Sequence, residues 1–219
     1  MRWIHDRSLT LTMLSLFVLF AIGQVVTGWH AHNAELVEHG RAALSFDGYL
    51  LAGHLWEAVF ENWESEFLQM AAFVTFTTVL YQVGSPESRR PGVVELVDVD
   101  PRRFSHLPDV PWPVSRGGWV LVVYEHSLGI ALFLLFAVSW VGHVLGGWSR
   151  HAVEEALHGQ APPSLAQYLA SSQFWFESFQ NWQSEFLSVA AMIWLAVYLR
   201  QRGSPESKPV HAPHTETGR

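Results

Sequence analysis

The sequence predicts an all-α integral membrane protein: a four-helix bundle made of two tandem, parallel two-helix repeats, with short amphipathic helices on the outer face. Three observations predict this fold class. Of the 219 residues, 49% are hydrophobic and only 15% are charged, whereas soluble domains carry about 25% charged residues. Four apolar stretches are long enough to cross a bilayer. A shift of 119 positions, which aligns Phe60 with Phe179, matches the chain with itself.

The four apolar stretches are expected to be membrane spans, because about 20 helical residues cross a hydrocarbon core of roughly 30 Å. We expect the spans at residues 8–28, 60–83, 125–146 and 179–200. The first stretch follows Arg2 and Arg7, as the apolar region of a signal peptide would. It aligns with an internal apolar stretch, however, and this favours a membrane anchor.

The internal repeat relates residues 8–88 to residues 127–207 without a gap, and about two positions in five are identical. The pentapeptide Gly-Ser-Pro-Glu-Ser at residues 84–88 recurs unchanged at residues 203–207. We therefore expect repeat one at residues 1–88 and repeat two at residues 119–207. Each repeat holds two spans, so both would enter the membrane from the same side, as parallel repeats do.

Basic residues give the orientation, because they are retained on the cytoplasmic side of a membrane. Of the 13 lysines and arginines, only Arg41 and Arg150 fall on the predicted outer side. Both termini are therefore predicted to be cytoplasmic, together with a Pro-rich linker at residues 89–118. The polar tail at residues 208–219 is expected to be disordered.

Charge and cysteine content exclude several function classes. The formal net charge is −7, which disfavours a nucleic-acid partner. The chain has no cysteine, and this excludes disulfides, thiol catalysis, Cys-ligated zinc, iron–sulfur clusters and c-type haem. We find no phosphate loop, nucleophile elbow, zinc-protease helix or dinucleotide fingerprint. The expected partner is the lipid bilayer, with a homo-oligomer or a membrane protein partner as an addition, and no cofactor is expected unless the metal site below forms.

A polar pair recurs inside the predicted spans: Asn62 and Glu66, matched by Asn181 and Glu185. A carboxylate at membrane depth faces protein, water or a partner, because exposure to lipid is costly. One interpretation is that each glutamate is satisfied within its own surroundings. The other is that Glu66 and Glu185 meet across the repeat axis and share a proton or bind a cation.

The duplicated pair leads to the first functional hypothesis, a small proton or cation conduit or a proton-linked transporter. The alternative is a non-catalytic membrane scaffold or sensor that binds a partner through the outer helices or the linker. Three further glutamates of the same helix lack acidic counterparts in repeat two, and we expect them to form a solvated face: Glu57, Glu61 and Glu64, aligned with Phe176, Gln180 and Gln183.

A histidine pattern in the outer segments gives a third hypothesis. Two sets of residues at i, i+3 and i+7 are each expected to share a helix face: His32, Glu35 and His39, and His151, Glu154 and His158. Imidazole and carboxylate together suit zinc, copper, iron or nickel. The simpler interpretation is a helix end, because His39 and His158 each precede glycine, as is typical of a helix C-terminus.

Several other residues are expected to serve packing. Trp63 and Trp182 belong to repeated aromatic stripes, typical of an interfacial belt and of helix packing, with a quinone or cofactor cleft as the alternative. Gly142 and Gly146 form a small-residue pair that lets helices approach closely. His143 lies within a span, but no second histidine is evident at that depth, so haem is not expected.

The blocks at residues 60–67 and 179–186, with the two Gly-Ser-Pro-Glu-Ser endings, resemble an uncharacterised family of bacterial four-span membrane proteins, a domain of unknown function. The resemblance covers nearly the whole chain. It implies a bacterial plasma membrane protein and carries over no activity, cofactor or catalytic residue.

Overall fold

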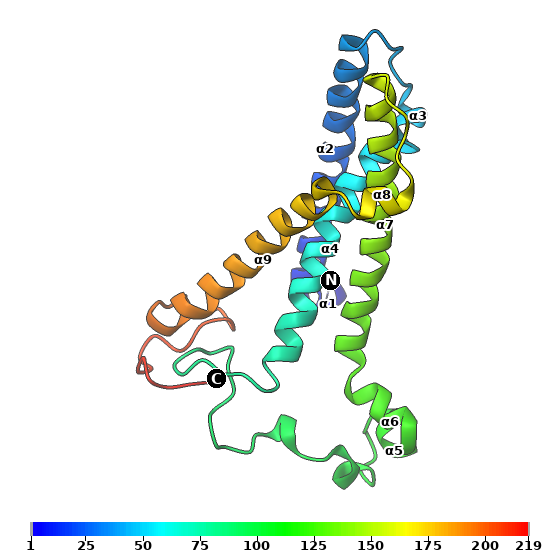
Figure 1. Ribbon diagram of the computed structural model, residues 1–219. Helices are drawn as coiled ribbons and strands as arrows, with labels where there is room; N and C mark the ends of the chain where they lie inside the picture. Colours follow the sequence, from blue (N-terminus) through cyan, green and yellow to red (C-terminus); the bar gives the residue numbers. More distant parts are fainter. Residues whose placement is uncertain (1, 219) are drawn as a thin grey trace. The chain divides into compact units, whose positions relative to one another are not determined.

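The computed structural model describes residues 2–218, and that part of the chain contains helices and no strand. Four helices are long: α2 (Ser8–Glu38), α4 (Gly53–Phe76), α7 (Ser127–Leu157) and α9 (Ser172–Tyr198) (Figure 1). All 11 prolines lie outside these four helices, because proline lacks the backbone donor and clashes with the preceding turn. The all-α prediction is confirmed.

The remaining elements are short: α1 (Arg2–His5), α3 (Phe46–Leu50), the 3₁₀ turns η1 (Leu96–Asp98) and η2 (Pro101–Phe104), α5 (Trp112–Arg116), α6 (Gly118–Glu125) and α8 (Leu165–Leu169). The linker at residues 89–118 therefore contains helical turns, although we expected an extended segment. Ser45 and Ser164 accept hydrogen bonds from the backbone N–H groups of Gly48 and Gln167, so both are N-caps of the short helices α3 and α8.

The shift of 119 positions that aligns the sequence with itself also relates the helix bounds. It takes both ends of α2 to those of α7, both ends of α3 to those of α8, and the start of α4 to the start of α9. The far end of α4 differs: the helix stops at Phe76, before the expected end at residue 83. Here the hydroxyls of Thr75, Thr77 and Thr78 bond to backbone carbonyls, an interaction that competes with helix continuation.

Helices α2 and α7 end in the same way, with a glycine in the left-handed conformation. Gly40 has φ +69° and Gly159 has φ +74°. In each copy the next backbone N–H reaches back into the last turn, from Arg41 to the carbonyl of Leu36 and from Gln160 to the carbonyl of Glu155. This pairing is the Schellman motif. It explains why these helices end where they do, and it supports the helix-end interpretation of the preceding histidines.

Two helices are long and apolar enough to cross a membrane, α2 and α7, with 31 residues and a peak hydropathy of 2.2 each. At 1.5 Å per residue such a helix is about 46 Å long, more than the roughly 30 Å of a hydrocarbon core. A helix of this length that crosses a bilayer would project beyond it. Both helices continue past the expected span ends at residues 28 and 146.

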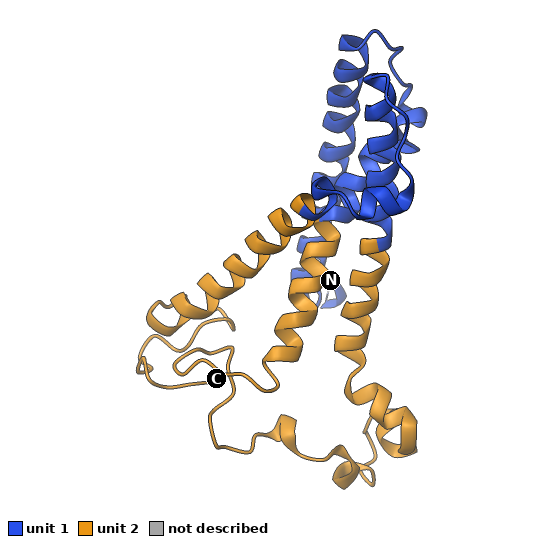
Figure 2. Ribbon diagram, in the orientation of Figure 1, with its two compact units in different colours: residues 1–61, 141–175 blue, residues 62–140, 176–219 orange. Residues whose placement is uncertain are grey.

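The chain forms two compact units (Figure 2). Unit 1 comprises residues 1–61 and 141–175, and unit 2 comprises residues 62–140 and 176–219. The interior of unit 1 includes Tyr49 and Tyr168, each 1% exposed. Their hydroxyls approach Gly28 and Gly147 so closely that a Cβ there would lie 2.3 and 2.0 Å away. The two glycines therefore allow tyrosines to pack against α2 and α7.

The C-terminal tail of unit 2 contains a turn built around Lys208. Lys208 is only 2% exposed. Its Nζ donates to the carbonyl oxygens of Pro213, His214 and Glu216 at 3.0 to 3.1 Å. One buried ammonium group that bonds three carbonyls thus holds this part of the tail in a turn.

Two hydrogen bonds connect the tail to the first Gly-Ser-Pro-Glu-Ser turn, at residues 84–88. The backbone N–H of Gly84 donates to the hydroxyl of Thr217 at 2.8 Å. The backbone N–H of Gly218 donates to the carbonyl of Ser85 at 3.0 Å. Residues 84–88 and the tail therefore form one cluster in unit 2.

Replacing Lys208 by methionine is expected to release the tail, because the substitution removes a cation that bonds three carbonyls. Hydrogen bonds to charged groups contribute about 1.5–3 kcal/mol each, so amide exchange at residues 209–218 should accelerate at least about tenfold. Hydrogen–deuterium exchange measures this rate. Arg202→Met, at an exposed position, is the control, and equal exchange in both variants would contradict the fastening.

Candidate functional site

The two duplicated glutamates are neighbours in unit 2. The carboxyl group of Glu185, on α9, lies close enough to that of Glu66, on α4, for the two acidic groups to interact electrostatically. The two glutamates that the repeat duplicates are therefore brought together across two helices of the same unit.

The asparagines of the duplicated pairs make local contacts. The Asn181 amide donates to the carbonyl of Glu177, one turn earlier in α9. The backbone carbonyl of Asn62 accepts a hydrogen bond from the hydroxyl of Ser65. Each of these bonds lies within a single helix.

A third glutamate of α4, Glu64, is fully buried in unit 2. Its Oε1 accepts a hydrogen bond from the indole Nε1 of Trp182 at 2.8 Å. The expectation that Glu57, Glu61 and Glu64 form a solvated face is therefore wrong for Glu64, and it is also wrong for Glu57, which is 3% exposed in unit 1. Trp182, expected to serve packing, also satisfies a buried carboxylate.

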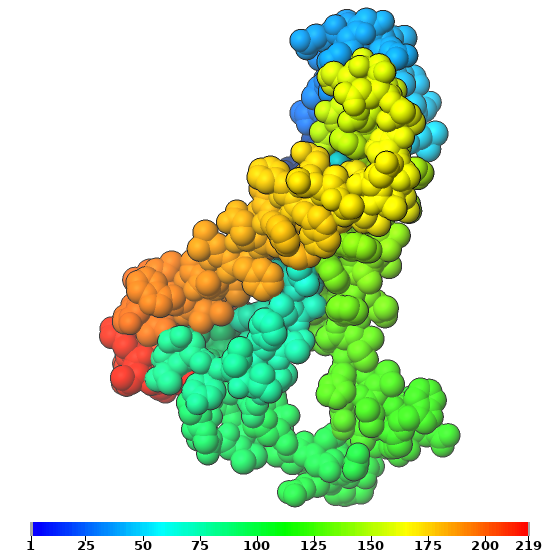
Figure 3. Space-filling model, viewed as in Figure 1, coloured from blue at the N-terminus to red at the C-terminus, as the bar shows by residue number. Residues whose placement is uncertain are grey.

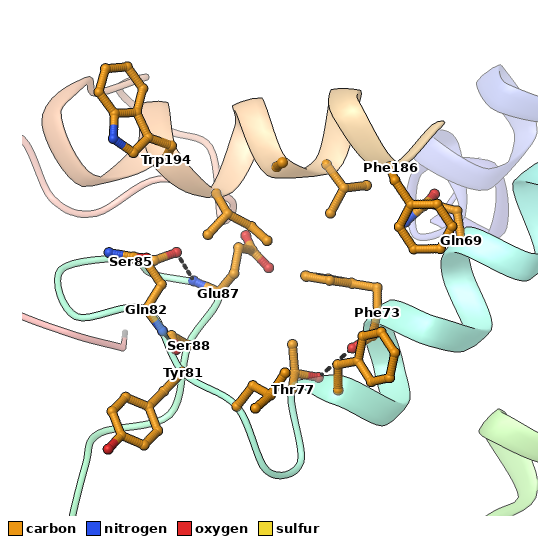
Figure 4. Close-up of a pocket in the computed structure, with 15 residues that line it drawn as sticks. Gln69, Phe73, Thr77, Tyr81, Gln82, Ser85, Glu87, Ser88, Phe186 and Trp194 are labelled. Carbon is orange, nitrogen blue, oxygen red and sulfur yellow. Dashed lines mark hydrogen bonds between the residues drawn. The ribbon is translucent and has the colours of Figure 1, made fainter. Parts of the chain in front are cut away.

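A groove of about 560 Å³ runs along α4 and α9 in unit 2 (Figure 4). Much of its lining is apolar and includes large side chains such as Phe73, Phe186 and Trp194. Gln69, which is 8% exposed, lines it one helical turn after Glu66. Phe186 directly follows Glu185 in α9. Along both helices, the carboxyl pair of Glu66 and Glu185 therefore lies next to one end of the groove.

The other end of the groove is polar, and it is formed by the Gly-Ser-Pro-Glu-Ser turn at residues 84–88. Ser85, Glu87 and Ser88 line it. Figure 4 shows the Glu87 side chain pointing from the turn into the groove, and its backbone N–H donates to the hydroxyl of Ser85 at 3.2 Å. The groove thus has acidic groups near both ends and a largely apolar lining.

Unit 1 contains an ion pair that the sequence analysis did not predict. Arg150, on α7, donates from Nη1 to Oε2 of Glu57, on α4, at 2.8 Å. The glutamate side chain is 5% exposed and the arginine side chain 39% exposed. A signal was present in the repeat: Glu57 aligns with Phe176 and Arg150 with Ala31. Both charges are missing from the other copy, as expected if they depend on each other.

Two histidines and a tyrosine lie beside this ion pair in unit 1. The rings of His32 and His54 stack, with their centroids 4.7 Å apart. The hydroxyl of Tyr49 and Nδ1 of His54 are 3.2 Å apart. Burial lowers the pKa of His54, and the neighbouring His32 and Arg150 lower it further, against a smaller opposing effect of Glu35. Burial raises the pKa of Tyr49. Both groups are therefore neutral at pH 7.

The lowered pKa of His54 predicts a loss of stability in acid. A histidine whose pKa is depressed in the folded state favours folding above its unfolded value, about 6.5, and that contribution is lost as the pH falls below this value. We expect the NMR titration midpoint of His54 to lie below 6.5. His54→Gln should flatten the fall in thermal stability between pH 7 and pH 5, and His106→Gln, in the linker, is the control.

The residues of the proposed metal site remain in two local sets at the ends of α2 and α7. Nδ1 of His39 and Nδ1 of His158 each face the backbone carbonyl four residues earlier at 2.9 Å, and the two rings lie 5.8 Å apart. The C-terminal ends of α2 and α7, which carry these histidines, lie side by side in unit 1 (Figure 3). The His32 and Glu35 side chains are 3.6 Å apart, and those of His151 and Glu154 are 3.8 Å apart. Among residues 2–218, no three histidine or acidic side chains lie where they would hold a metal ion. The metal hypothesis has no geometric support.

The glycine pair of α7 lies against α4 in unit 1. A Cβ at Gly142 would lie 2.4 Å from the ring of Phe60, and one at Gly146 would lie 2.5 Å from the backbone nitrogen of Glu57. These glycines allow the close approach that their spacing indicates. His143 is fully buried between them, and its ring lies 5.1 Å from that of Phe174. Trp63 is 38% exposed.

One comparison with known proteins gives a match. A family model described as a domain of unknown function (DUF6766) matches residues 1–219. No curated protein and no solved structure matches the chain.

Proposed function

The chain belongs to this family of unknown function, and from its site we propose that it is a membrane protein that conducts protons or small cations past Glu66 and Glu185. The single observation that carries the proposal is the close approach of these two duplicated acidic groups, one on α4 and one on α9. Such a pair binds one proton readily, because two negative charges repel each other at a site partly shielded from water. The doubly ionised pair is therefore unfavourable. The pair can thus accept and release a proton or exchange it for a cation.

The proposal includes four spans in a bacterial plasma membrane, with both termini cytoplasmic and the repeats parallel. Helices α4 and α9 would be the second and fourth spans. Charges in a span are tolerated where protein satisfies them, and α4 meets this condition at Glu64 through the indole N–H of Trp182. Ten residues separate Glu66 from the end of α4 at Phe76, about 15 Å of helix, which is near the middle of a hydrocarbon core.

The groove along α4 and α9 supports a path for the conducted ion. Gln69 would hydrogen-bond a water molecule that takes the proton from the carboxyl pair into the groove, and Glu87 would receive it at the polar end. The apolar part of the groove, with Phe73 and Phe186, would conduct only when wetted, because hydrophobic constrictions gate by dewetting. The path would therefore be closed at rest and open when water enters.

The test is a flux measurement with the full chain in proteoliposomes that contain a pH-sensitive dye. The wild type should dissipate a proton gradient faster than empty liposomes. Glu66→Gln combined with Glu185→Gln should return the rate to that of empty liposomes, because amides do not titrate. The matched control is Glu61→Gln, since repeat two already carries Gln180 at that position.

Two results would overturn the conduit: no flux of protons, Na⁺ or K⁺ in the wild type, or unchanged flux in the double variant. Absence of flux together with a partner protein lost on deletion of residues 92–114 would favour the scaffold function instead.

The proposed topology predicts the location of reporters. A phosphatase fused after Glu38 should be active, because this enzyme requires the oxidising outer compartment, and one fused after Pro101 should be inactive. Fluorescent-protein fusions at the same sites should give the opposite pattern. An inactive phosphatase after Glu38 would contradict the orientation.

A further inference from the structure

Unit 1 contains a second cavity, of about 730 Å³, which the proposed conduit does not use. Cavities of 300–1,000 Å³ are the usual size for small organic ligands. Residues from α2, α3 and α7, the segment after α2 and the start of α4 line it. Much of the wall is apolar and includes Leu36, Leu51 and Trp148.

The charged residues that line this cavity are both cationic. They are Arg41 and Arg150, the two basic residues that the sequence places apart from the other 11. Within the described chain, no acidic side chain lines the cavity. Glu57 stands behind the wall, where its bond to Arg150 at 2.8 Å holds the guanidinium in place. The polar part of the cavity therefore favours an anionic ligand.

Further polar groups of the wall reinforce this character. His32 lines the cavity with its side chain 10% exposed, and among residues 2–218 its Nδ1 has no hydrogen-bond partner; a contact with Glu35 at 3.6 Å is electrostatic only if the ring is protonated. A buried polar atom without a hydrogen bond indicates a missing ligand or water. Helix α4 begins at Gly53, in the wall, so the positive end of its dipole adds to the cationic field.

We propose that this cavity binds a small organic monoanion, a carboxylate with an apolar body. The carboxylate would bond to Arg41 and Arg150, with His32 as a further donor, and the apolar body would lie against Leu36, Leu51 and Trp148. A single charge fits better than a phosphate dianion, because Glu57 and Glu35 already offset part of the positive charge. The proposal does not depend on conduction, since it involves no residue of the carboxyl pair or groove.

Calorimetric titration of the full chain with octanoate at pH 7.5 tests the proposal, with the protein in nanodiscs of phosphatidylcholine. We expect one saturable site per chain. Octanol and octylammonium have the same apolar body without the negative charge, and they should bind at least about tenfold more weakly, because a charge-assisted bond to arginine is absent.

Variants locate the site. Arg41→Gln should weaken octanoate binding at least about tenfold, whereas Arg202→Gln, an exposed arginine outside the cavity, should leave it unchanged. Ala156→Trp should abolish binding by filling the cavity. Arg41 is chosen because loss of Arg150 would also remove the partner of buried Glu57. Equal thermal melting of the variants and the wild type shows that folding is intact.

The anionic group could come from a free solute or from a lipid head group, and further titrations distinguish them. If octanoate affinity falls in nanodiscs of phosphatidylglycerol, the lipid competes for the same site. If it stays constant there and inorganic phosphate does not compete, the ligand is a free carboxylate. Octanol binding as tightly as octanoate, no loss in Arg41→Gln, or no saturable binding in either nanodisc would overturn the proposal.

Discussion

Replacement of Arg150 by alanine is expected to lower the free energy of unfolding by about 3 kcal/mol. The carboxylate of Glu57 is 5% exposed and would lose the guanidinium 2.8 Å away. Removing one partner of a buried ion pair costs about 3–5 kcal/mol. The lower end applies because the arginine side chain is 39% exposed and water screens part of the interaction. Unfolding in mixed micelles with increasing dodecyl sulfate measures the change.

The repeat supplies the control for this experiment. The other copy carries Phe176 and Ala31 at the aligned positions, so Glu57→Phe combined with Arg150→Ala exchanges the ion pair for that apolar pair. An apolar replacement of a buried ion pair is often neutral or stabilising. The double variant should therefore be more stable than Arg150→Ala alone. If the two are equally unstable, the loss reflects arginine packing and not the orphaned carboxylate.

Gly146→Ala is expected to destabilise unit 1 by about 2–4 kcal/mol. The new methyl group would lie 2.5 Å from the backbone nitrogen of Glu57 and 3.0 Å from its Cα. Backbone atoms cannot rotate away as a side chain can, so α4 and α7 would have to separate. Overpacking of this kind typically costs about 1–3 kcal/mol and sometimes more. Thermal melting followed by tryptophan fluorescence detects the loss.

The matched control is Gly23→Ala, at the position in α2 that aligns with Gly142. A Cβ at Gly23 would meet nothing within 4 Å. Alanine is favoured over glycine in a helix interior by about 1 kcal/mol, so this variant should melt at the same temperature as the wild type or higher. Equal destabilisation by both substitutions would show that helix flexibility, and not close packing, requires these glycines.

Much of the helical framework could be predicted from the sequence, because local rules determine it. Apolar runs without proline predicted the four long helices, and the His–Gly pairs indicated the ends of α2 and α7. The predicted C-terminal ends of two spans were less accurate. Hydropathy alone placed one span end at residue 28, although polar residues continue α2 to Glu38, and it extended another span to residue 83, although the threonine run stops α4 at Phe76.

The candidate site was only partly predictable, because contacts across helices depend on packing. Duplication alone marked Glu66 and Glu185. It gave no indication that Glu64 would be buried against Trp182, since an acidic residue without a counterpart is usually solvated. The pairing of Glu57 with Arg150 leaves a trace in the repeat, because both charges are absent from the other copy. The pairing can be predicted only when Glu57 and Arg150 are both compared with their counterparts in the other repeat.

The two identical pentapeptides differ in their surroundings, with a practical consequence for antibodies. Four of the five residues at 84–88 are buried, in a turn to which the tail is fastened, whereas none of residues 203–207 is buried. A Cβ at Gly84 would lie 2.4 Å from the carbonyl of His214, while one at Gly203 would meet nothing within 4 Å. An antibody raised against Gly-Ser-Pro-Glu-Ser would therefore find one epitope in the folded chain and two after denaturation.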